Sequence, residues 1–212
     1  MTDDQVRQAW RLKWRLNTER LSAIIRPVAQ RIYSTDVEWR DLDERLAHYG
    51  RDWGGMDLNP DFQRGHVWTE IQQQRFIEAA LRGTLGTSAL SIQFNCPNWE
   101  NEHYCGDLPR GFQCIDGLQR ITAVSRFIQG HVLPFGLSVA DLDLSKFQIK
   151  NNYAFRLEVF AFEQKAKVIE HYLGLNDGGT PHSEEEIARV RNLLAESTVD
   201  LQTENHPTPQ AG

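Results

Sequence analysis

The residues best suited to chemistry lie in the segment 112–120, FQCIDGLQR. Its apolar start and its Asp-Gly pair predict a short strand that gives way to a helix over about 118–129. Asp116, Gly117 and Arg120 would then surround the N-terminus of this helix, where free backbone N–H groups attract anions. Gly117 lets the backbone approach a phosphate, and Arg120 can bind phosphate oxygens in a bidentate manner. The segment therefore predicts an anion site at a strand-to-helix junction.

The carboxylate of Asp116 suits two chemical roles. It could hold a divalent metal such as Mg²⁺, or it could position a water molecule for hydrolysis. A purely structural alternative is that Asp116 caps the helix that begins beside it and needs no ligand. The sequence leaves both interpretations open.

A second arginine lies upstream, in the segment 59–68, NPDFQRGHVW. Arg64 follows a proline-stiffened stretch and Gln63, and Trp68 could line a binding site or stack on a base. The alternative is that Arg64 makes an ordinary salt bridge and Trp68 lies in the core. Because Arg64 and Arg120 come from separate segments, we predict that together they form a phosphate clamp.

Three cysteines and a histidine lie close together, but their pattern does not predict a metal site. Cys96, His103 and Cys105 fall in one polar loop and Cys114 follows it, and this spacing does not match structural zinc motifs. An odd number of cysteines also argues against a disulfide framework, so reduced thiols are expected. The sequence contains no P-loop, nucleophile-elbow or zinc-protease motif.

The first 31 residues read as a basic amphipathic helical arm. Thr2 and Gln5 form a capping-box pattern, Trp10 and Trp14 belong to an apolar stripe, and Pro27 marks the stop. The stripe could dock on the rest of the protein. Alternatives are an arm that binds a partner or nucleic acid, and a helix that lies on a membrane surface.

Residues 32–198 read as a single α+β domain, and residues 199–212 as a disordered tail. The expected strands cover 28–38, 89–94, 112–115 and 154–160. The expected helices cover 39–48, 70–82, 118–129, 164–173 and 183–196, and a polar loop covers 95–111.

Charge is distributed unevenly along the 212 residues. The net charge is −6, with +4 in residues 1–31 and −10 in the remainder. Because phosphate contacts supply most non-specific affinity, so acidic a body is a poor nucleic-acid binder, and any DNA contact should use the arm. No apolar run approaches the roughly 18–20 residues that span a bilayer, and no signal-peptide core is visible. We therefore expect a cytoplasmic protein that does not enter the membrane.

Taken together, the segments resemble the DGQQR-motif nucleotidase domain, also known as domain-of-unknown-function family 262. This domain occurs at the N-terminus of GmrSD-type restriction enzymes and of the phosphorothioation-sensing effector SspE, and is similar to the ParB/sulfiredoxin fold. Three blocks carry the resemblance in order: 59–68, IDGLQRIT at 115–122, and NDGGTPHS at 176–183. Ordered blocks are far more specific than one motif.

The resemblance implies a domain that binds and hydrolyses nucleoside triphosphates (NTPs) with Mg²⁺ or another divalent metal. Arg64 and Arg120 would face the phosphates, and Asp116 would face the metal or the water. The implied catalytic residues are thus Asp116, Arg120 and Arg64. The implied nucleotide-binding residues are Gln63, Arg64, Gly117, Gln119, Arg120 and Asn176.

One departure from the family bears on turnover. Leu118 stands where the motif has its first glutamine, and a leucine cannot hydrogen-bond a nucleotide or a water. The sequence also ends soon after the last block, so a nuclease or effector partner is expected to be a separate protein.

The resemblance implies a DNA-linked process of restriction, phage defence or counter-defence. Two other functions stay open. One is a metal-dependent module that nicks or binds DNA, although the sequence offers Asp116 no second acid nearer than Asp107 and such sites usually gather several carboxylates. The other is a non-enzymatic regulatory protein.

Overall fold

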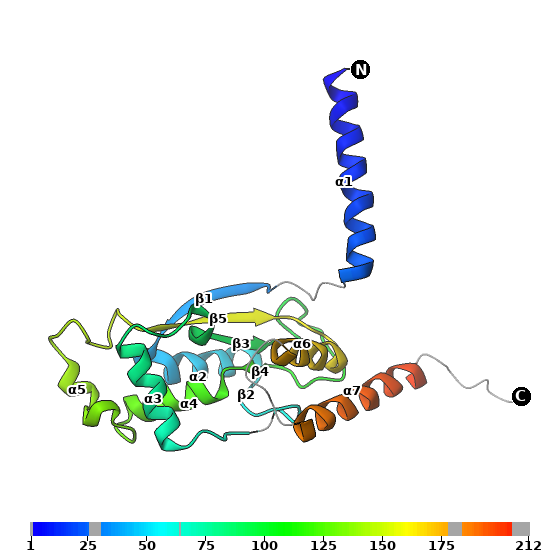
Figure 1. Cartoon of the computed structure of the whole chain (residues 1–212). Coiled ribbons are helices and arrows are strands. Elements are labelled where there is room, and N and C mark those ends of the chain that lie inside the picture. The colour runs from blue at the N-terminus through cyan, green and yellow to red at the C-terminus, as the bar shows by residue number, and fades with distance from the viewer. Residues whose placement is uncertain (1, 26–30, 64, 178–183, 205–212) are drawn as a thin grey trace, which may run out of the picture. The chain divides into compact units, whose positions relative to one another are not determined.

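A computed structural model describes residues 2–25, 31–63, 65–177 and 184–204 (Figure 1). The chain divides into two compact units, Met1–Gln30 and Arg31–Gly212.

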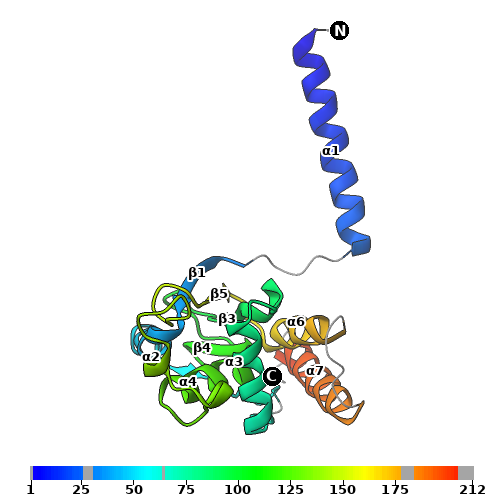
Figure 2. The same ribbon diagram turned by 60° about the vertical axis from the view of Figure 1, so that its left-hand side comes forward.

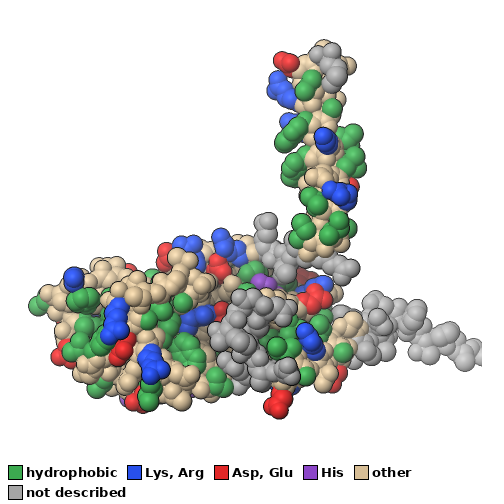
Figure 3. Space-filling model, viewed as in Figure 1, with side chains coloured by type: hydrophobic (Ala, Val, Ile, Leu, Met, Phe, Trp, Pro, Cys, Tyr) green, Lys and Arg blue, Asp and Glu red, His purple; other side chains and the backbone are tan. Residues whose placement is uncertain are grey.

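The first unit contains helix α1 (Asp3–Ile25). Its predicted capping box is confirmed, because the Thr2 N–H donates to Gln5 Oε1 over 2.9 Å and the Gln5 N–H donates to Thr2 Oγ1 over 3.4 Å. Figure 3 shows basic and apolar side chains along this helix. The exposed basic residues are Arg7, Arg11, Lys13, Arg15 and Arg20.

The second unit is built on one mixed five-stranded sheet, with strand order β1-β5-β3-β4-β2. β1 pairs antiparallel with β5, β5 parallel with β3, β3 antiparallel with β4, and β4 parallel with β2. The predicted α+β class is therefore confirmed. The strands are β1 (Tyr33–Glu38), β2 (Met56–Asp57), β3 (Ser91–Asn95), β4 (Phe112–Asp116) and β5 (Ala154–Phe160).

Helices cover both faces of this sheet. Short 3-10 turns precede α2 at Trp39–Asp41, precede β3 at Thr87–Leu90, and precede α5 at Pro134–Gly136. The helices of this unit are α2 (Leu42–Trp53), α3 (Glu70–Leu81), α4 (Leu118–Ile128), α5 (Val139–Leu142), α6 (Lys165–Asp177) and α7 (Glu184–Glu204).

Two hydrophobic clusters form the core. In the larger cluster, Ile92, Cys114 and Leu157 from the sheet pack with Ile77 of α3 and Phe127 of α4. The smaller cluster lies against α6 and α7, which run side by side away from α2 and α4 (Figure 2). It contains Phe62, Tyr104, Leu108, Ile115, Phe160, Phe162, Val168, Ile169, Tyr172 and Val190.

Local signals gave some element boundaries correctly. The Thr69–Gln72 capping box at the start of α3 is confirmed, and this helix stops just before Gly83, whose φ is +70°. The expected strand at 89–94 starts only at Ser91, because residues 87–90 form a 3-10 turn.

The C-terminal helix is longer than expected. α7 continues to Glu204, so residues 199–204 are helical rather than part of the predicted tail 199–212. These six residues contain no glycine or proline, and the first proline after them is Pro207, so nothing in their sequence stops the helix. Residues 205–212 lie outside the described residues.

Among the described residues, no helix is both long enough and apolar enough to cross a bilayer.

Candidate functional site

A cavity of about 1120 Å³ lies over the polar side of the sheet. Its wall comes from the 3-10 turn before β3, from strands β1, β3, β4 and β5, and from α4 and α6. Eight residues from the two predicted segments line it: Gln63, Trp68, Ile115, Asp116, Gly117, Leu118, Gln119 and Arg120. The fold thus brings the 59–68 and 112–120 segments to one space.

A β-bulge puts the Asp116 side chain on the cavity side of the sheet. Phe112 and Cys114 of β4 point into the larger core, so simple alternation would send Asp116 the same way. The pairing shifts, however, so that Phe94 faces Cys114 while Gln93 faces Asp116. The extra residue, Ile115, lets Asp116 share the face of Gln93.

Asp116 and Arg120 form an ion pair at the N-terminus of α4. The Arg120 side chain is only 18% exposed and that of Asp116 is 45% exposed. Gly117, rather than Asp116, is the N-cap residue of α4, and no side chain caps the helix. The interpretation of Asp116 as a helix cap is therefore wrong, and its carboxylate, paired with Arg120, lies in the cavity wall.

Arg120 has a buried hydrogen-bond donor without a partner among the described residues. Its Nη2 donates to Asp116 Oδ2, whereas its Nε is buried and has no partner among them. A buried donor without an acceptor is costly.

Gly117 is required by packing as well as by any ligand. Its φ is +120°, and a Cβ atom added there would lie 2.7 Å from Ile92 Cγ2. Any other residue would thus be strained in its backbone and would clash with β3.

The two glutamines predicted to bind nucleotide also make contacts with the backbone. Gln119 Oε1 accepts from the N–H groups of Val67 and Trp68, each over 3.0 Å, while its Nε2 donates to the Gly65 carbonyl over 2.8 Å. Gln63 Nε2 donates to the Cys114 carbonyl. Both side chains therefore hold the cavity wall, and Gln119 positions the loop that follows Arg64.

Trp68 fills both of its predicted roles, as part of the binding-site wall and as part of the core. It lines the cavity and also packs on the larger core, with its ring centroid 5.5 Å from that of Phe76.

The other predicted residues are placed as follows. Leu118 is 8% exposed and packs into the larger core at the cavity edge. Asn176 belongs to the last turn of α6, but its side chain lies outside the described residues. Arg64 and residues 178–183 lie outside them altogether.

The sequence did not reveal that two further acidic residues, Asp36 and Glu158, line the cavity. Glu158 of β5 is paired with Gln93, the same residue that faces Asp116 from the other side. Because neighbouring strands lie about 4.8 Å apart, the backbones of Asp116 and Glu158, which are two strands apart, are separated by about 10 Å. Asp107, the acid nearest to Asp116 in the preceding sequence, is not among the residues that line the cavity.

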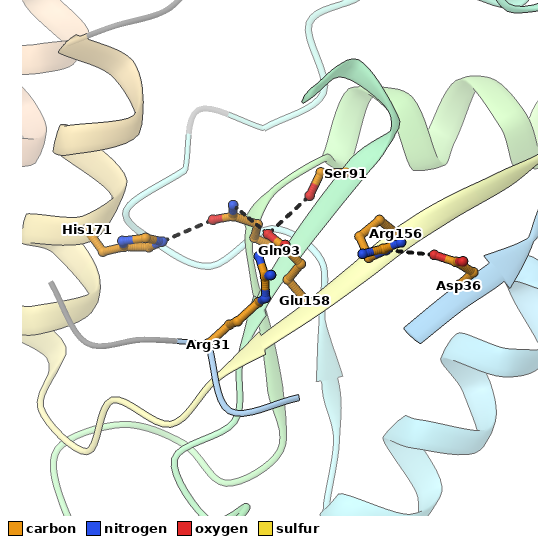
Figure 4. A network of polar contacts seen from close by, with 7 residues as sticks. All are labelled: Arg31, Asp36, Ser91, Gln93, Arg156, Glu158 and His171. Atoms are coloured by element: carbon orange, nitrogen blue, oxygen red, sulfur yellow. Dashed lines mark hydrogen bonds and ion pairs between the residues drawn. The ribbon is translucent and has the colours of Figure 1, made fainter. Parts of the chain in front are cut away.

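Figure 4 shows the polar network around Glu158, whose side chain is 12% exposed. Arg31 Nη1 donates to Oε1 over 2.7 Å, while Ser91 and Gln93 donate to Oε2 over 3.3 and 3.1 Å. A separate pair joins Arg156 Nε to Asp36 Oδ1 over 2.7 Å on the same face.

This network determines the protonation of His171 on α6. A carboxylate can only accept, so Gln93 turns its amino group to Glu158 and its oxygen to His171 Nε2, which lies 3.0 Å away. His171 Nε2 must then carry a hydrogen. Burial lowers the pKa of His171, while the charges of Glu158 and Asp116 oppose that shift, so the ring is a neutral donor near pH 7.

The three cysteines form no disulfide in the described structure. Cys96 and Cys114 are buried and Cys105 is exposed. No group of three or more His, Cys, Asp or Glu side chains within the described ranges could hold a metal ion.

The fold and site thus define an α+β domain with a large polar cavity at a strand-to-helix junction. The chain belongs to the family of the GmrSD restriction endonuclease N-terminal domain, whose model matches residues 47–193. The predicted resemblance is confirmed at this level. The matched range includes all three sequence blocks. No curated protein and no solved structure matches the chain.

Proposed function

We propose that the cavity binds a nucleoside triphosphate together with Mg²⁺ and hydrolyses it. The observation that carries this proposal is the Arg120 side chain, which lines a cavity at the N-terminus of α4 and whose buried Nε has no partner in the described structure. A guanidinium group and the N-terminus of a helix favour the same ligand, a phosphate.

The charges of the cavity explain why binding should depend on the metal. The described lining contains three carboxylates, from Asp36, Asp116 and Glu158, and two guanidinium groups, from Arg120 and Arg156. Such a lining does not attract a polyanion by charge alone. Mg²⁺ often binds through one or two carboxylates plus substrate phosphates, which fits Asp116 better than a site built from protein ligands only.

In this proposal the Asp116–Arg120 pair exchanges partners when the ligand enters. Arg120 turns its donors to phosphate oxygens, where it offsets the charge that grows during transfer. Asp116 is released to hold the metal or to orient the attacking water. Mg²⁺ would neutralise phosphate charge. Leu118 adds no polar group at this point, so turnover should be slow relative to binding.

We further propose that this activity serves restriction or another defence or counter-defence process acting on DNA. The support is the family to which the chain belongs. We also propose that the fold is similar to that of ParB/sulfiredoxin proteins. A separate effector protein would respond to the nucleotide state of this domain.

The experiment is a hydrolysis assay with GTP, ATP, CTP and UTP, with Mg²⁺ or EDTA, and with or without duplex DNA. The proposal expects metal-dependent release of phosphate or pyrophosphate from at least one nucleotide, and loss of that release in Asp116→Asn. No release above the Asp116→Asn background under any condition would refute hydrolysis, and binding would then have to be judged separately.

A second candidate function is DNA contact through α1. Its five exposed basic residues contrast with the acidic remainder of the chain. The double variant Arg11→Glu, Arg15→Glu should weaken DNA retention and flatten its dependence on salt. Unchanged retention in that variant would exclude the arm as the DNA contact.

A further inference from the structure

The turn at residues 60–63 is fixed from outside the sheet, by α7. Arg189 Nη1 donates to the Asp61 carbonyl over 2.7 Å, and its Nη2 donates to the carbonyls of Phe62 and Gln63 over 3.3 and 3.0 Å. A single guanidinium thus binds three successive carbonyls, which the five donors and planar geometry of arginine permit.

Arg189 is itself held in place. Its Nη2 donates to Glu186 over 2.8 Å, one turn earlier on α7, and this hydrogen bond raises the pKa of Arg189 above its already high value. Its charge is therefore permanent. The helix is anchored beside it by Val190, which is fully buried in the smaller core together with Phe62.

A second contact fixes the same turn from α6. Lys165 Nζ lies 2.5 Å from Asp61 Oδ2. Helices α6 and α7 therefore fix the turn through its backbone carbonyls and through the side chain of Asp61.

The turn that α6 and α7 fix places the Gln63 side chain in the cavity wall. Gln63 lines the cavity and donates to the carbonyl of Cys114, one residue beyond the last pairing between β2 and β4 at Gln113. Cys114 directly precedes the bulge that turns Asp116 toward the cavity. The contacts run without a break from Arg189 through Gln63 to the strand that ends in Asp116.

We infer that Arg189 is a positioning residue for the nucleotide site, which acts by fixing the Gln63 wall of the cavity. This inference rests on the proposed function for its effect on nucleotide, but its effect on the turn is independent of any ligand. Arg189 lies in α7, far from both motif segments in sequence, and neither segment reveals it.

The test compares Arg189→Ala and Arg189→Lys with the matched control Arg191→Ala. Arg191 is an exposed arginine on the same helix, and within the described residues no hydrogen bond or ion pair joins it to the turn. Hydrogen exchange of the amides at 61–63 is measured first, together with thermal unfolding. Arg189→Ala should speed exchange in this segment, and Arg191→Ala should not. Equal exchange in all proteins would overturn the inference.

The second measurement is the dissociation constant of each protein variant for each of the four nucleotides in the presence of Mg²⁺. Arg189→Ala should weaken binding about tenfold, since small displacements of a positioned group are costly, while Arg189→Lys should keep part of the affinity. In the Gln63→Ala background, Arg189→Ala should add little, because both act through one contact chain. Full additivity of the two, or an equal loss in Arg191→Ala, would overturn the role in the site.

The two measurements also separate this inference from the proposed function. If the wild-type protein binds no nucleotide, the proposed function fails, and the exchange data still decide whether Arg189 fixes the turn. If Arg189→Ala does not fold, Arg189→Lys supplies both measurements.

Discussion

Arg120 of α4 donates to the carboxylate of Asp116, the last residue of β4, across the glycine at which the strand becomes a helix. The pair is local in sequence, but its exposure to the cavity depends on the bulge that turns Asp116 to the polar side of the sheet. In the proposed function, a ligand that takes the Arg120 donors and binds the Asp116 carboxylate would compete with this pairing.

Gly117 should tolerate no side chain. Gly117→Ala combines a φ of +120° with a Cβ contact of 2.7 Å to Ile92, so we expect a loss of about 2 kcal/mol or more in the free energy of unfolding. Urea titration measures it. The control is Gly130→Ala, where φ is +77° but no atom lies within 4 Å of the added Cβ, so the loss should be only about 1 kcal/mol. Equal losses would contradict the packing argument.

Gln119 should act mainly on the loop at 65–68. In Gln119→Ala the N–H groups of Val67 and Trp68 lose their common acceptor, so their hydrogen exchange should accelerate. The free energy of unfolding should fall by about 1 kcal/mol, since water can reach part of this loop. In the control Gln129→Ala, which removes only a side-chain bond to Asp43, exchange at 67–68 should stay as in the wild type. Unchanged exchange in Gln119→Ala would show that the loop is held by other contacts.

His171 should make the protein less stable in mild acid. Because burial lowers its pKa below the usual 6.5, the unfolded chain takes up the proton first. The stability that depends on neutral His171 is therefore complete above about pH 6.5 and is lost as the pH falls toward the lower, folded-state value. Urea midpoints at pH 7.5 and 5.5 should differ less in His171→Gln than in the wild type. An equal pH dependence in both proteins would count against this assignment.

The thiols should differ sharply in reactivity. Burial raises the pKa of both Cys96 and Cys114 to about 12, so neither forms the reactive thiolate near neutral pH. In the folded protein, a chromogenic disulfide reagent should label Cys105 alone, because it is exposed. Cys105→Ser should abolish the fast reaction, and rapid labelling that persists in this variant would place a buried thiol at the surface.

The sequence predicted features whose causes are local. The capping boxes at Thr2 and Thr69, and the strand-to-helix break at Asp116 and Gly117, each depend on residues within a few positions of one another, so spacing alone reveals them. The hydrogen bonds and charges expected at these positions followed from the types of the residues.

The rest of the site depends on strand order and register. Glu158 reaches the site only because β5 pairs with β3, which places it beside Gln93, 65 residues away in sequence. Alternation within 154–160 shows that Glu158 shares a face with Arg156, but not which strand lies next to it. The bulge at Ile115 was hidden for the same reason, since a register shift is a property of two strands.

The most direct test of the central claim is calorimetric titration of the four nucleoside triphosphates, with Mg²⁺, into the wild-type protein, Arg120→Ala and Arg126→Ala. Arg126 is a matched control because it lies on α4 and pairs with Glu70, outside the cavity lining. We predict saturable binding of at least one nucleotide to the wild type and to Arg126→Ala, weakened about tenfold or more in Arg120→Ala. Folded wild-type protein that binds none of the nucleotides, or Arg120→Ala that binds as tightly as the wild type, would contradict the account.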